Sequence, residues 1–167
     1  MIAAFDLSVV GTGYCNGDKI GVWRPNKLKG IERMDYILDA IKEITYPDDI
    51  VVFLEGFSFN SKGKAVYEIA GLGYLVRYHL WMQDIPTYLV PPASIKKYAT
   101  GKGHAKKPDM LAAAIRRFDY DGPTDDNAVD AFLLWHLANE YLGHPVVGVP
   151  AAQAKCVGKV ERMEFRK

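Results

Sequence analysis

Four acidic side chains stand where an α/β fold could bring them together. Asp6 and Glu55 each directly follow a short apolar segment of the kind that forms a buried strand. Asp126 and Asp130 are four residues apart near the start of an apolar helical pattern, so both project from one helix face. Residues just past the ends of buried strands lie at the sheet edge where ligands bind. We therefore expect these four carboxylates to converge.

Such a cluster is electrostatically unfavourable by itself. Like charges a few ångströms apart repel, and some of the acids would stay protonated unless divalent cations were bound. Oxygen ligands without Cys or His suit Mg²⁺ or Mn²⁺. Two such ions about 4 Å apart can activate a water, stabilise the leaving oxygen and hold a phosphate for in-line attack. The acids therefore predict two-metal phosphodiester hydrolysis with Mg²⁺, for which Mn²⁺ can substitute.

Each acid also has an ordinary structural explanation. Asp6 could cap a turn, and Glu55 could be an exposed strand end. Asp125 or Asp126 could be the N-cap of the following helix, where negative charge is favoured. The joint placement of the acids, rather than any one of them, favours a catalytic site.

The charge distribution is segregated, although the net charge is only +1. Near-neutrality is mildly unfavourable to a DNA-binding protein, which usually has a basic surface. Five lysines lie within twelve residues: Lys96, Lys97, Lys102, Lys106 and Lys107. A group of acids follows: Asp119, Asp121, Asp125, Asp126 and Asp130. A nuclease needs cations for phosphates and anions for metals, but a solvated surface can show the same segregation.

Apolar periodicity predicts a single α/β domain. The expected strands cover residues 2–5, 14–23 (two strands joined by a tight turn at 16–17), 50–54 and 86–90. The expected helices cover residues 30–44, 61–82, 108–118 and 126–142. This order implies a mixed five-stranded sheet with helices packed on both faces. Residues 1–142 would form the catalytic domain, and 143–167 a tail of unassigned role in the same domain.

The sequence favours a cytoplasmic protein without a membrane partner. No apolar run approaches the ~18 residues that span a bilayer. The N-terminal residues have no basic region and reach an acid at position 6, so we expect no signal peptide. Cys15 and Cys156 are far apart and in no metal-ligand spacing, which is typical of reduced thiols.

Four segments resemble the RuvC family of Holliday-junction resolvases, especially its phage-encoded members. They are DLSVVGTG at 6–13, LEGFSFNSKG at 54–63, TGKGHAKK at 100–107 and DDNAVDA at 125–131. The segments occur in the family's order and at suitable intervals. The resemblance implies an RNase H-like fold, a homodimer, Mg²⁺ dependence, and paired nicks in a four-way junction that leave 5′-phosphate and 3′-hydroxyl ends. A phage-encoded member would act in the host cytoplasm.

The resemblance also assigns the acids. By position, Asp6, Glu55 and Asp130 would be catalytic metal ligands. Cellular members place Asp or His three residues before the last Asp, where this chain has Asn127. Asp126 lies one residue earlier on the same helix face, so we expect Asp126 to complete the metal site, with Asn127 as the alternative.

Cations and aromatic side chains complete the predicted site. Lys107 matches the family's catalytic lysine, and an ammonium there would neutralise charge on the scissile phosphate or leaving group. Phe57 and Phe59 flank the position of the family's junction wedge, where an aromatic face can stack on a base; the alternative is that they are core residues. The loop residues expected to contact DNA are Lys102, His104 and Lys106. Further candidates for phosphate contacts are Arg77, Arg116 and Arg117.

Two glycines bear on the oligomeric state. Gly71 and Gly73 fall inside a predicted helix, where each costs up to ~1 kcal/mol relative to Ala. They indicate close approach by another backbone, either the sheet or a second subunit. We expect a homodimer that forms along this helix.

Two other functions stay open at this point. One is a debranching nuclease that cuts forks and flaps as readily as four-way junctions. The other is a non-catalytic RNase H-like protein that binds DNA. A retained cluster of repelling acids weighs against the second alternative. We expect the partner to be branched DNA: four-way junctions, with forks and flaps as further substrates.

Overall fold

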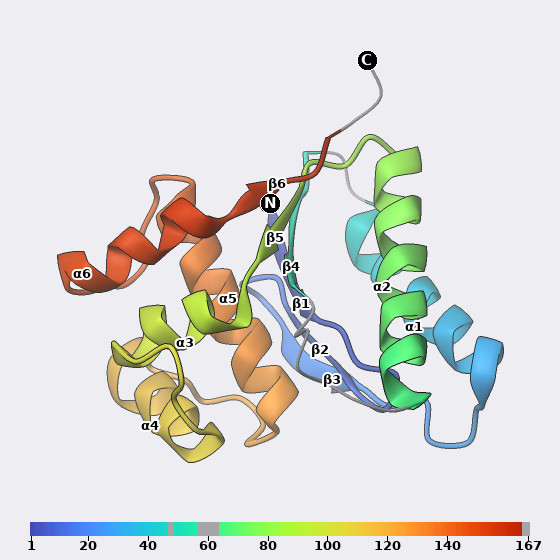
Figure 1. Ribbon diagram of the computed structural model, residues 1–167, viewed down its shortest axis with the longest axis horizontal. Helices are drawn as coiled ribbons and strands as arrows, with labels where there is room; N and C mark the ends of the chain where they lie inside the picture. The colour runs from blue at the N-terminus through green and yellow to red at the C-terminus, as the bar shows by residue number, and fades with distance from the viewer. Residues whose placement is uncertain (47–48, 57–63, 165–167) are drawn as a thin grey trace.

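A mixed sheet forms the centre of the molecule (Figure 1). The computed structural model describes residues 1–46, 49–56 and 64–164. Its strands are β1 (Ile2–Asp6), β2 (Thr12–Cys15), β3 (Ile20–Trp23), β4 (Val51–Glu55), β5 (Thr87–Val90) and β6 (Glu161–Arg162). They lie in the order β3-β2-β1-β4-β5-β6. The pairs β1–β4 and β4–β5 are parallel and the other pairs are antiparallel.

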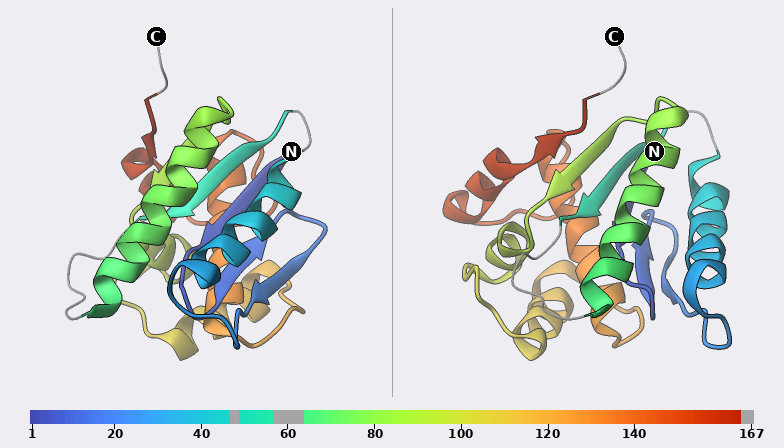
Figure 2. Two further views of the ribbon diagram at one scale, coloured as in Figure 1. Left: turned by 90° about the vertical axis from the view of Figure 1, so that its right-hand side faces the viewer. Right: turned by 45° about the vertical axis from the view of Figure 1, so that its right-hand side comes forward.

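Helices cover both faces of this sheet. They are α1 (Gly30–Thr45), α2 (Lys64–Met82), α3 (Pro92–Thr100), α4 (Lys107–Phe118), α5 (Asp126–Tyr141), α6 (Ala151–Ala154) and the 3₁₀ helix η1 (Lys155–Lys159). Figure 2 shows α1 and α2 on one face, with α3, α4 and α5 on the other. Among the described residues, no helix has the length and apolar character needed to cross a bilayer.

The central strands are apolar on both sides because both faces are covered. Phe5 and Leu54 are fully buried on the side of α1 and α2. Ala4 and Phe53 are fully buried on the side of α5. Side chains alternate between the faces of a strand, so a strand covered on both sides reads as a continuous apolar run. This explains why residues 2–5 and 50–54 are apolar throughout.

Helix α5 lies unusually close to the sheet at its N-terminal end. A Cβ atom added to Gly13 would stand 1.8 Å from the backbone oxygen of Asn127. Ala128 and Ala131, on the helix, are fully buried. The small residues on both elements therefore let the helix backbone rest on β2, which brings the following turn of α5 to the ends of β1 and β4.

The predicted mixed sheet with helices on both faces is confirmed, but the strand number is six within the described residues rather than five. The additional strand is β6, which pairs antiparallel with β5 through Leu89 and Glu161. A strand of two residues has no apolar alternation to detect, and its partner is distant in the sequence. Helix α3 was also not predicted. Its Pro92 lies in the first helical turn, where the missing N–H breaks no helical hydrogen bond, so Pro91-Pro92 begins a helix here as well as ending a strand.

The segment after Gly143 packs on the same core. Val147, Val149, Val157 and Val160 are partly buried against the cluster formed by α3, α4, α5 and one sheet face. Together with the pairing of β6, these contacts join the C-terminal segment to the rest of the described chain, and its assignment to the same domain stays a prediction.

Candidate metal centre

Three carboxylates from distant parts of the chain meet at the carboxyl edge of the parallel strands. In the β1–β4 pair, Phe5 lies opposite Leu54, so the next residues, Asp6 and Glu55, are neighbours at the strand ends. Asp130 comes from the second turn of α5, which crosses these strands. One carboxylate oxygen of each acid lies within 4.8 Å of the others. The predicted convergence of Asp6, Glu55 and Asp130 is therefore present.

Burial makes this cluster a poor place for three negative charges. Burial and then the nearby Asp130 raise the pKa of Asp6 to about 7. Burial, followed by the charges of Asp6 and Asp130, raises the pKa of Glu55 well above its ordinary value. Burial also raises the pKa of Asp130 to about 6, although the positive charge of Lys96 opposes this. The cluster binds protons tightly and would bind another cation for the same electrostatic reason.

Asp126 has a different partner from these three acids. Its Oδ2 accepts a hydrogen bond of 2.6 Å from Nζ of Lys107, the first residue of α4. Both side chains are exposed, at 44% for Asp126 and 71% for Lys107. The hydrogen bond to Asp126, with the charges of Asp130 and Asp6 contributing less, raises the pKa of Lys107. Lys107 is thus held beside the cluster, and Asp126 lies outside the group of carboxylates within 4.8 Å.

The two residues that flank Asp126 are also engaged. Asp125 is the N-cap of α5, where its Oδ1 accepts the backbone N–H of Asn127 at 3.0 Å, and its Oδ2 pairs with Arg24 at the end of β3. The side-chain amide of Asn127 donates to the backbone oxygen of Gly11. Three consecutive residues therefore bind three different parts of the fold, and this fixes the start of α5 relative to the sheet.

Hydroxyl groups order the loop that follows Asp6. The Thr12 hydroxyl donates to the Ser8 backbone oxygen at 2.8 Å and accepts the Ser8 N–H at 3.2 Å. These reciprocal bonds close the turn between β1 and β2. The Ser and Thr of the 6–13 segment thus position the strand end that carries Asp6.

Lys96 faces the cluster and was not predicted as a site residue. It lies on α3, directly after β5, and is partly buried. Its charge lowers the pKa of both Asp130 and Glu55, which places its ammonium near them. The available signal was the helical spacing of Ile95, Tyr98 and Ala99 after Pro92, all three of which are buried.

The other predicted contact residues are only partly described. Lys102, His104 and Lys106 are exposed in or next to the connection between α3 and α4, as a DNA-contact role requires. Phe57 and Phe59, predicted to stack on bases, lie outside the described residues.

The predicted phosphate contact of Arg117 has a different partner in the structure. Its guanidinium donates to the Ala99 backbone oxygen at 2.8 Å and to Gln153 Oε1 at 2.9 Å. It therefore links α4 to α3 and to the C-terminal segment.

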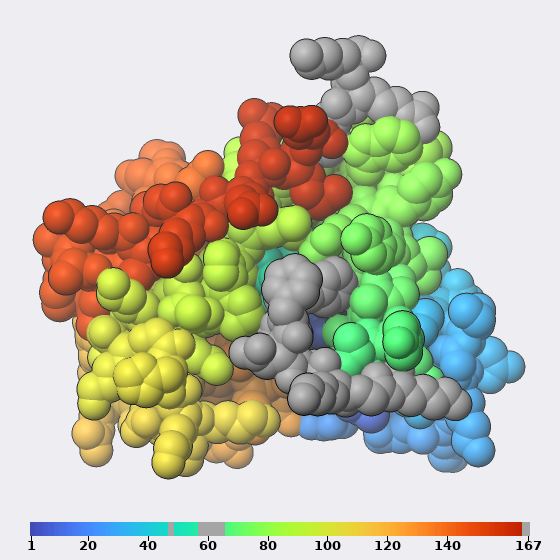
Figure 3. Space-filling view, in the orientation of Figure 1, coloured from blue at the N-terminus to red at the C-terminus, as the bar shows by residue number. Residues whose placement is uncertain are grey.

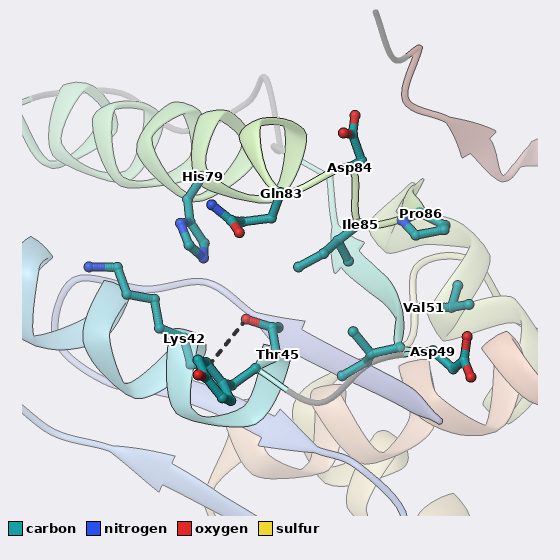
Figure 4. A pocket seen from close by; sticks show the side chains of 11 residues that line it. Lys42, Thr45, Asp49, Val51, His79, Gln83, Asp84, Ile85 and Pro86 are labelled. Atoms are coloured by element: carbon teal, nitrogen blue, oxygen red, sulfur yellow. Dashed lines mark hydrogen bonds between the residues drawn. The ribbon is translucent and has the colours of Figure 1, made fainter.

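A cavity of about 940 Å³ lies at the opposite edge of the sheet (Figure 4). It is bordered by the C-terminal parts of α1 and α2, by the first residue of β4 and by the residues just before β5. Its lining includes Lys42, Thr45, His79 and Gln83. Burial, and then the charge of Lys42, lower the pKa of His79. None of the clustered acids lines this cavity, so the carboxylates sit at an edge separate from it.

Comparisons with known proteins agree on one group. No family model matches the chain. The chain is 28% identical over 108 residues to a crossover junction endodeoxyribonuclease RuvC of Synechococcus sp. (strain CC9311), covering 64% of this chain and 67% of the relative. It superposes on Thermus thermophilus RuvC bound to a Holliday junction substrate with a TM-score of 0.67 at 18% identity, covering 88% of this chain and 98% of that chain. A second T. thermophilus RuvC structure gives a TM-score of 0.64 at 18% identity, covering 88% and 99%.

The structural likeness extends over most of both molecules. At this level of identity it establishes the fold, and the predicted RNase H-like fold is confirmed. The likeness to the Synechococcus relative is one of sequence and is therefore independent of the structural superposition.

Proposed function

We propose that this RuvC-like chain is a metal-dependent endonuclease that resolves four-way DNA junctions. The observation that carries the proposal is the meeting of Asp6, Glu55 and Asp130 within 4.8 Å on a fold shared with junction resolvases. A protein that only bound DNA would gain nothing from three partly buried acids whose pKa values are raised by their surroundings. Metal-dependent hydrolysis of a phosphodiester, by contrast, would make use of such a cluster.

The donor set fits a divalent cation. Three carboxylates without Cys or His among them are hard oxygen ligands of the kind that Mg²⁺ and Mn²⁺ prefer. Asp6, Glu55 and Asp130 would hold the metal. When bound, such ions polarise a phosphate oxygen and activate water for in-line attack. The use of two ions, and of Mg²⁺ rather than Mn²⁺, remains a prediction.

Two lysines would handle the negative charge of the substrate. Lys107 is held next to the acids by Asp126, and Lys96 approaches them from α3. The positive charges of these two lysines would stabilise charge that develops on the phosphate and the leaving oxygen. We assign Asp126 to Lys107 rather than to the metal, because its oxygen already lies 2.6 Å from that ammonium.

The proposal includes a homodimer formed along α2. Tyr67, Gly71, Leu75 and Tyr78 recur at helical spacing on this helix, and all are exposed. Tyr67 is 80% exposed and Tyr78 60%. Among the described residues, and apart from the helix's own backbone and the chain neighbours of Gly71, only the Met34 side chain lies within 4 Å of a Cβ added at Gly71. Its lack of a side chain therefore leaves room for a partner. A single species of monomer mass in light scattering at micromolar concentration would contradict the dimer.

Cleavage of a labelled synthetic four-way junction tests the nuclease proposal. Wild-type protein should nick opposing strands symmetrically with Mg²⁺ and should not cut in EDTA. Glu55→Gln should bind the junction without cutting it. Asp18→Asn, which removes an exposed acid in the turn between β2 and β3, is the matched control and should cut like the wild type.

Cleavage of other branched DNA substrates, measured alongside the four-way junction, determines the substrate range. Comparable cutting of three-way and forked DNA would indicate a debranching nuclease rather than a dedicated resolvase. Junction binding without cleavage in either Mg²⁺ or Mn²⁺ would overturn the enzymatic proposal in favour of a DNA-binding role. The cytoplasmic location and the phage origin remain predictions.

A further inference from the structure

Two stretches of the chain without acids lie against one another on one side of the molecule. Residues 91–108 and 141–160 contain seven lysines and no Asp or Glu. The first stretch includes α3, and the second includes α6 and η1, both of which pack against α3. Figure 3 shows the red C-terminal segment lying along the yellow-green α3 region on the face in view. These two stretches thus carry a local excess of positive charge in a protein whose net charge is only +1.

The C-terminal segment is held on α3 by specific contacts. Arg117 donates both to the Ala99 backbone oxygen and to Gln153 Oε1, so one guanidinium joins the end of α3 to α6. Gly101 ends α3 with φ +82°, and a Cβ added there would stand 2.8 Å from Gln153 Nε2. Cys156 of η1 is buried, and η1 packs against α3. The position of the segment is therefore defined by the fold.

Lysines from both stretches face solvent around this contact. Lys97 of α3, and Lys155 and Lys159 of η1, are exposed. The charges of Lys97 and Lys159 both act on the Cys156 thiol, where they oppose the effect of burial on its pKa. Cations from two distant segments therefore lie close to one buried atom. We call Lys97, Lys155 and Lys159 the tail basic surface.

The adjacent Lys96 and Lys97 of α3 act on different groups. The charge of Lys96 acts on Asp130, while Lys97 is exposed and its charge acts on Cys156 of η1. The surface offers little apart from charge, because the exposed neighbours Ala151, Ala152 and Gly158 have no large side chain. Cations without apolar or planar anchors contact a polyanion through its charge and not its sequence. A duplex, with one phosphate charge per about 1.7 Å of axis, presents such a polyanion.

We infer that the tail basic surface binds the phosphates of a duplex arm of the branched substrate, away from the phosphate that is cut. The inference rests on the proposed function for the identity of the substrate. It gives the C-terminal segment a role in holding a second part of the DNA while the carboxylate site acts on the first.

The salt dependence of binding tests the inference. Each phosphate neutralised by a lysine contributes about 0.9 to the slope of log affinity against log salt concentration on duplex DNA. Lys155→Ala/Lys159→Ala should therefore reduce the magnitude of this slope by about 2, and Lys159→Ala alone by about 1. Binding is measured in EDTA, so that the readout does not depend on cleavage. Lys19→Ala removes an exposed lysine from the turn at the far edge of the sheet and should leave the slope unchanged.

Arm length provides a second readout. With arms of about two helical turns the wild type should show the steeper slope, and with arms of about half a turn it should match the double variant. Equal slopes for wild type and double variant on long arms, with unchanged melting temperatures, would overturn the inference. That result would leave the nuclease proposal intact if the wild type still cuts the junction. Absence of cleavage with an intact slope difference would instead contradict only the nuclease proposal.

Discussion

Two groups of acids near the start of α5 differ in how their charge is balanced. Asp6, Glu55 and Asp130 are part-buried side chains whose carboxylates meet, and within the described residues none forms an ion pair with a Lys or Arg. Asp125 and Asp126, one turn earlier in the helix, are each paired with a cation of the protein, Arg24 and Lys107. Within the described residues the second group is already paired with cations of the protein, whereas protons or a bound metal ion would have to balance the charge of the first.

Under the proposed function, the contrast separates metal ligands from positioning residues. Partly buried acids without an opposite charge are costly, and such groups are found where a metal or a proton relieves the repulsion. Exposed ion pairs contribute only about 0–1 kcal/mol to stability. Asp126 and Asp125 therefore act mainly by fixing geometry, in one case of a lysine and in the other of a helix end.

The largest effect is expected from a substitution in the cluster of Asp6, Glu55 and Asp130. Asp6→Asn should lower the rate of junction cleavage by about 10³-fold or more, because a metal-bound transition state loses several kcal/mol of stabilisation. Single-turnover cleavage with saturating protein measures the rate. Junction affinity in EDTA should be retained, and cleavage at near wild-type rate would remove Asp6 from the metal site.

The next largest effect is expected on how the stability of the protein depends on pH. In the folded protein the pKa of Asp6 is about 7 and that of Asp130 about 6, against 3.8 for both as ordinary values. The folded chain therefore holds more protons than the unfolded chain between pH 4 and 7, so its unfolding free energy falls as pH rises through this range. Without added metal we expect a loss of about 2 kcal/mol or more between pH 5 and 8.

Denaturant unfolding at several pH values checks this expectation. Asp6→Asn should flatten the profile and be more stable than the wild type at pH 8. Added Mg²⁺ should stabilise the wild type more at pH 8 than at pH 5, because the ligands must be deprotonated. A wild-type profile no steeper than that of the variant would contradict the tight proton binding of the cluster.

A smaller effect is expected at Asp126. If it positions Lys107, Asp126→Asn should slow cleavage by about 10-fold, the size of a lost orienting contact. It should have no further effect in a Lys107→Ala background, because the two residues act as a unit. The stabilisation of the protein by Mg²⁺ should persist in Asp126→Asn and be lost in Asp130→Asn. Loss of this stabilisation in both variants would make Asp126 a fourth ligand.

The smallest effect is expected at the ion pair between Arg24 and Asp125. Arg24→Ala removes an exposed cation that is 46% accessible, and should cost less than about 1 kcal/mol of stability. Asp125→Ala also removes the helix N-cap and should cost about 1 kcal/mol. Thermal unfolding of both variants measures the difference. A larger loss for Arg24→Ala than for Asp125→Ala would mean that the ion pair, and not the cap, holds the start of α5.

Local pattern was enough to predict most of the fold and the central acids. Asp6 and Glu55 end apolar strands, and Asp130 lies at helical spacing in α5, so sequence position alone indicated their meeting. Lys96 was missed because Pro91-Pro92 was interpreted only as the end of a strand. A proline pair both ends a strand and begins a helix, and only the buried residues that follow distinguish the two cases.

Features that depend on distant partners could not be predicted. The spacing of Asp126 and Asp130 shows that they share a helix face, but not that Lys107 lies next to the first of them. The strand β6 exists because β5 offers an unpaired edge, which is a property of the assembled sheet. The fourth acid and the tail were therefore among the points at which sequence reasoning left alternatives open or made no assignment.

The short β6 also covers β5, which would otherwise be an edge strand of the sheet. Without it, β5 would present free N–H and C=O groups along Thr87–Val90, an apolar stretch of the kind that pairs with strands of other molecules. A chain ending before Glu161 should therefore self-associate on storage or during refolding, even where its folded core is intact. The pairing of two β6 residues with β5 should thus reduce aggregation through this edge.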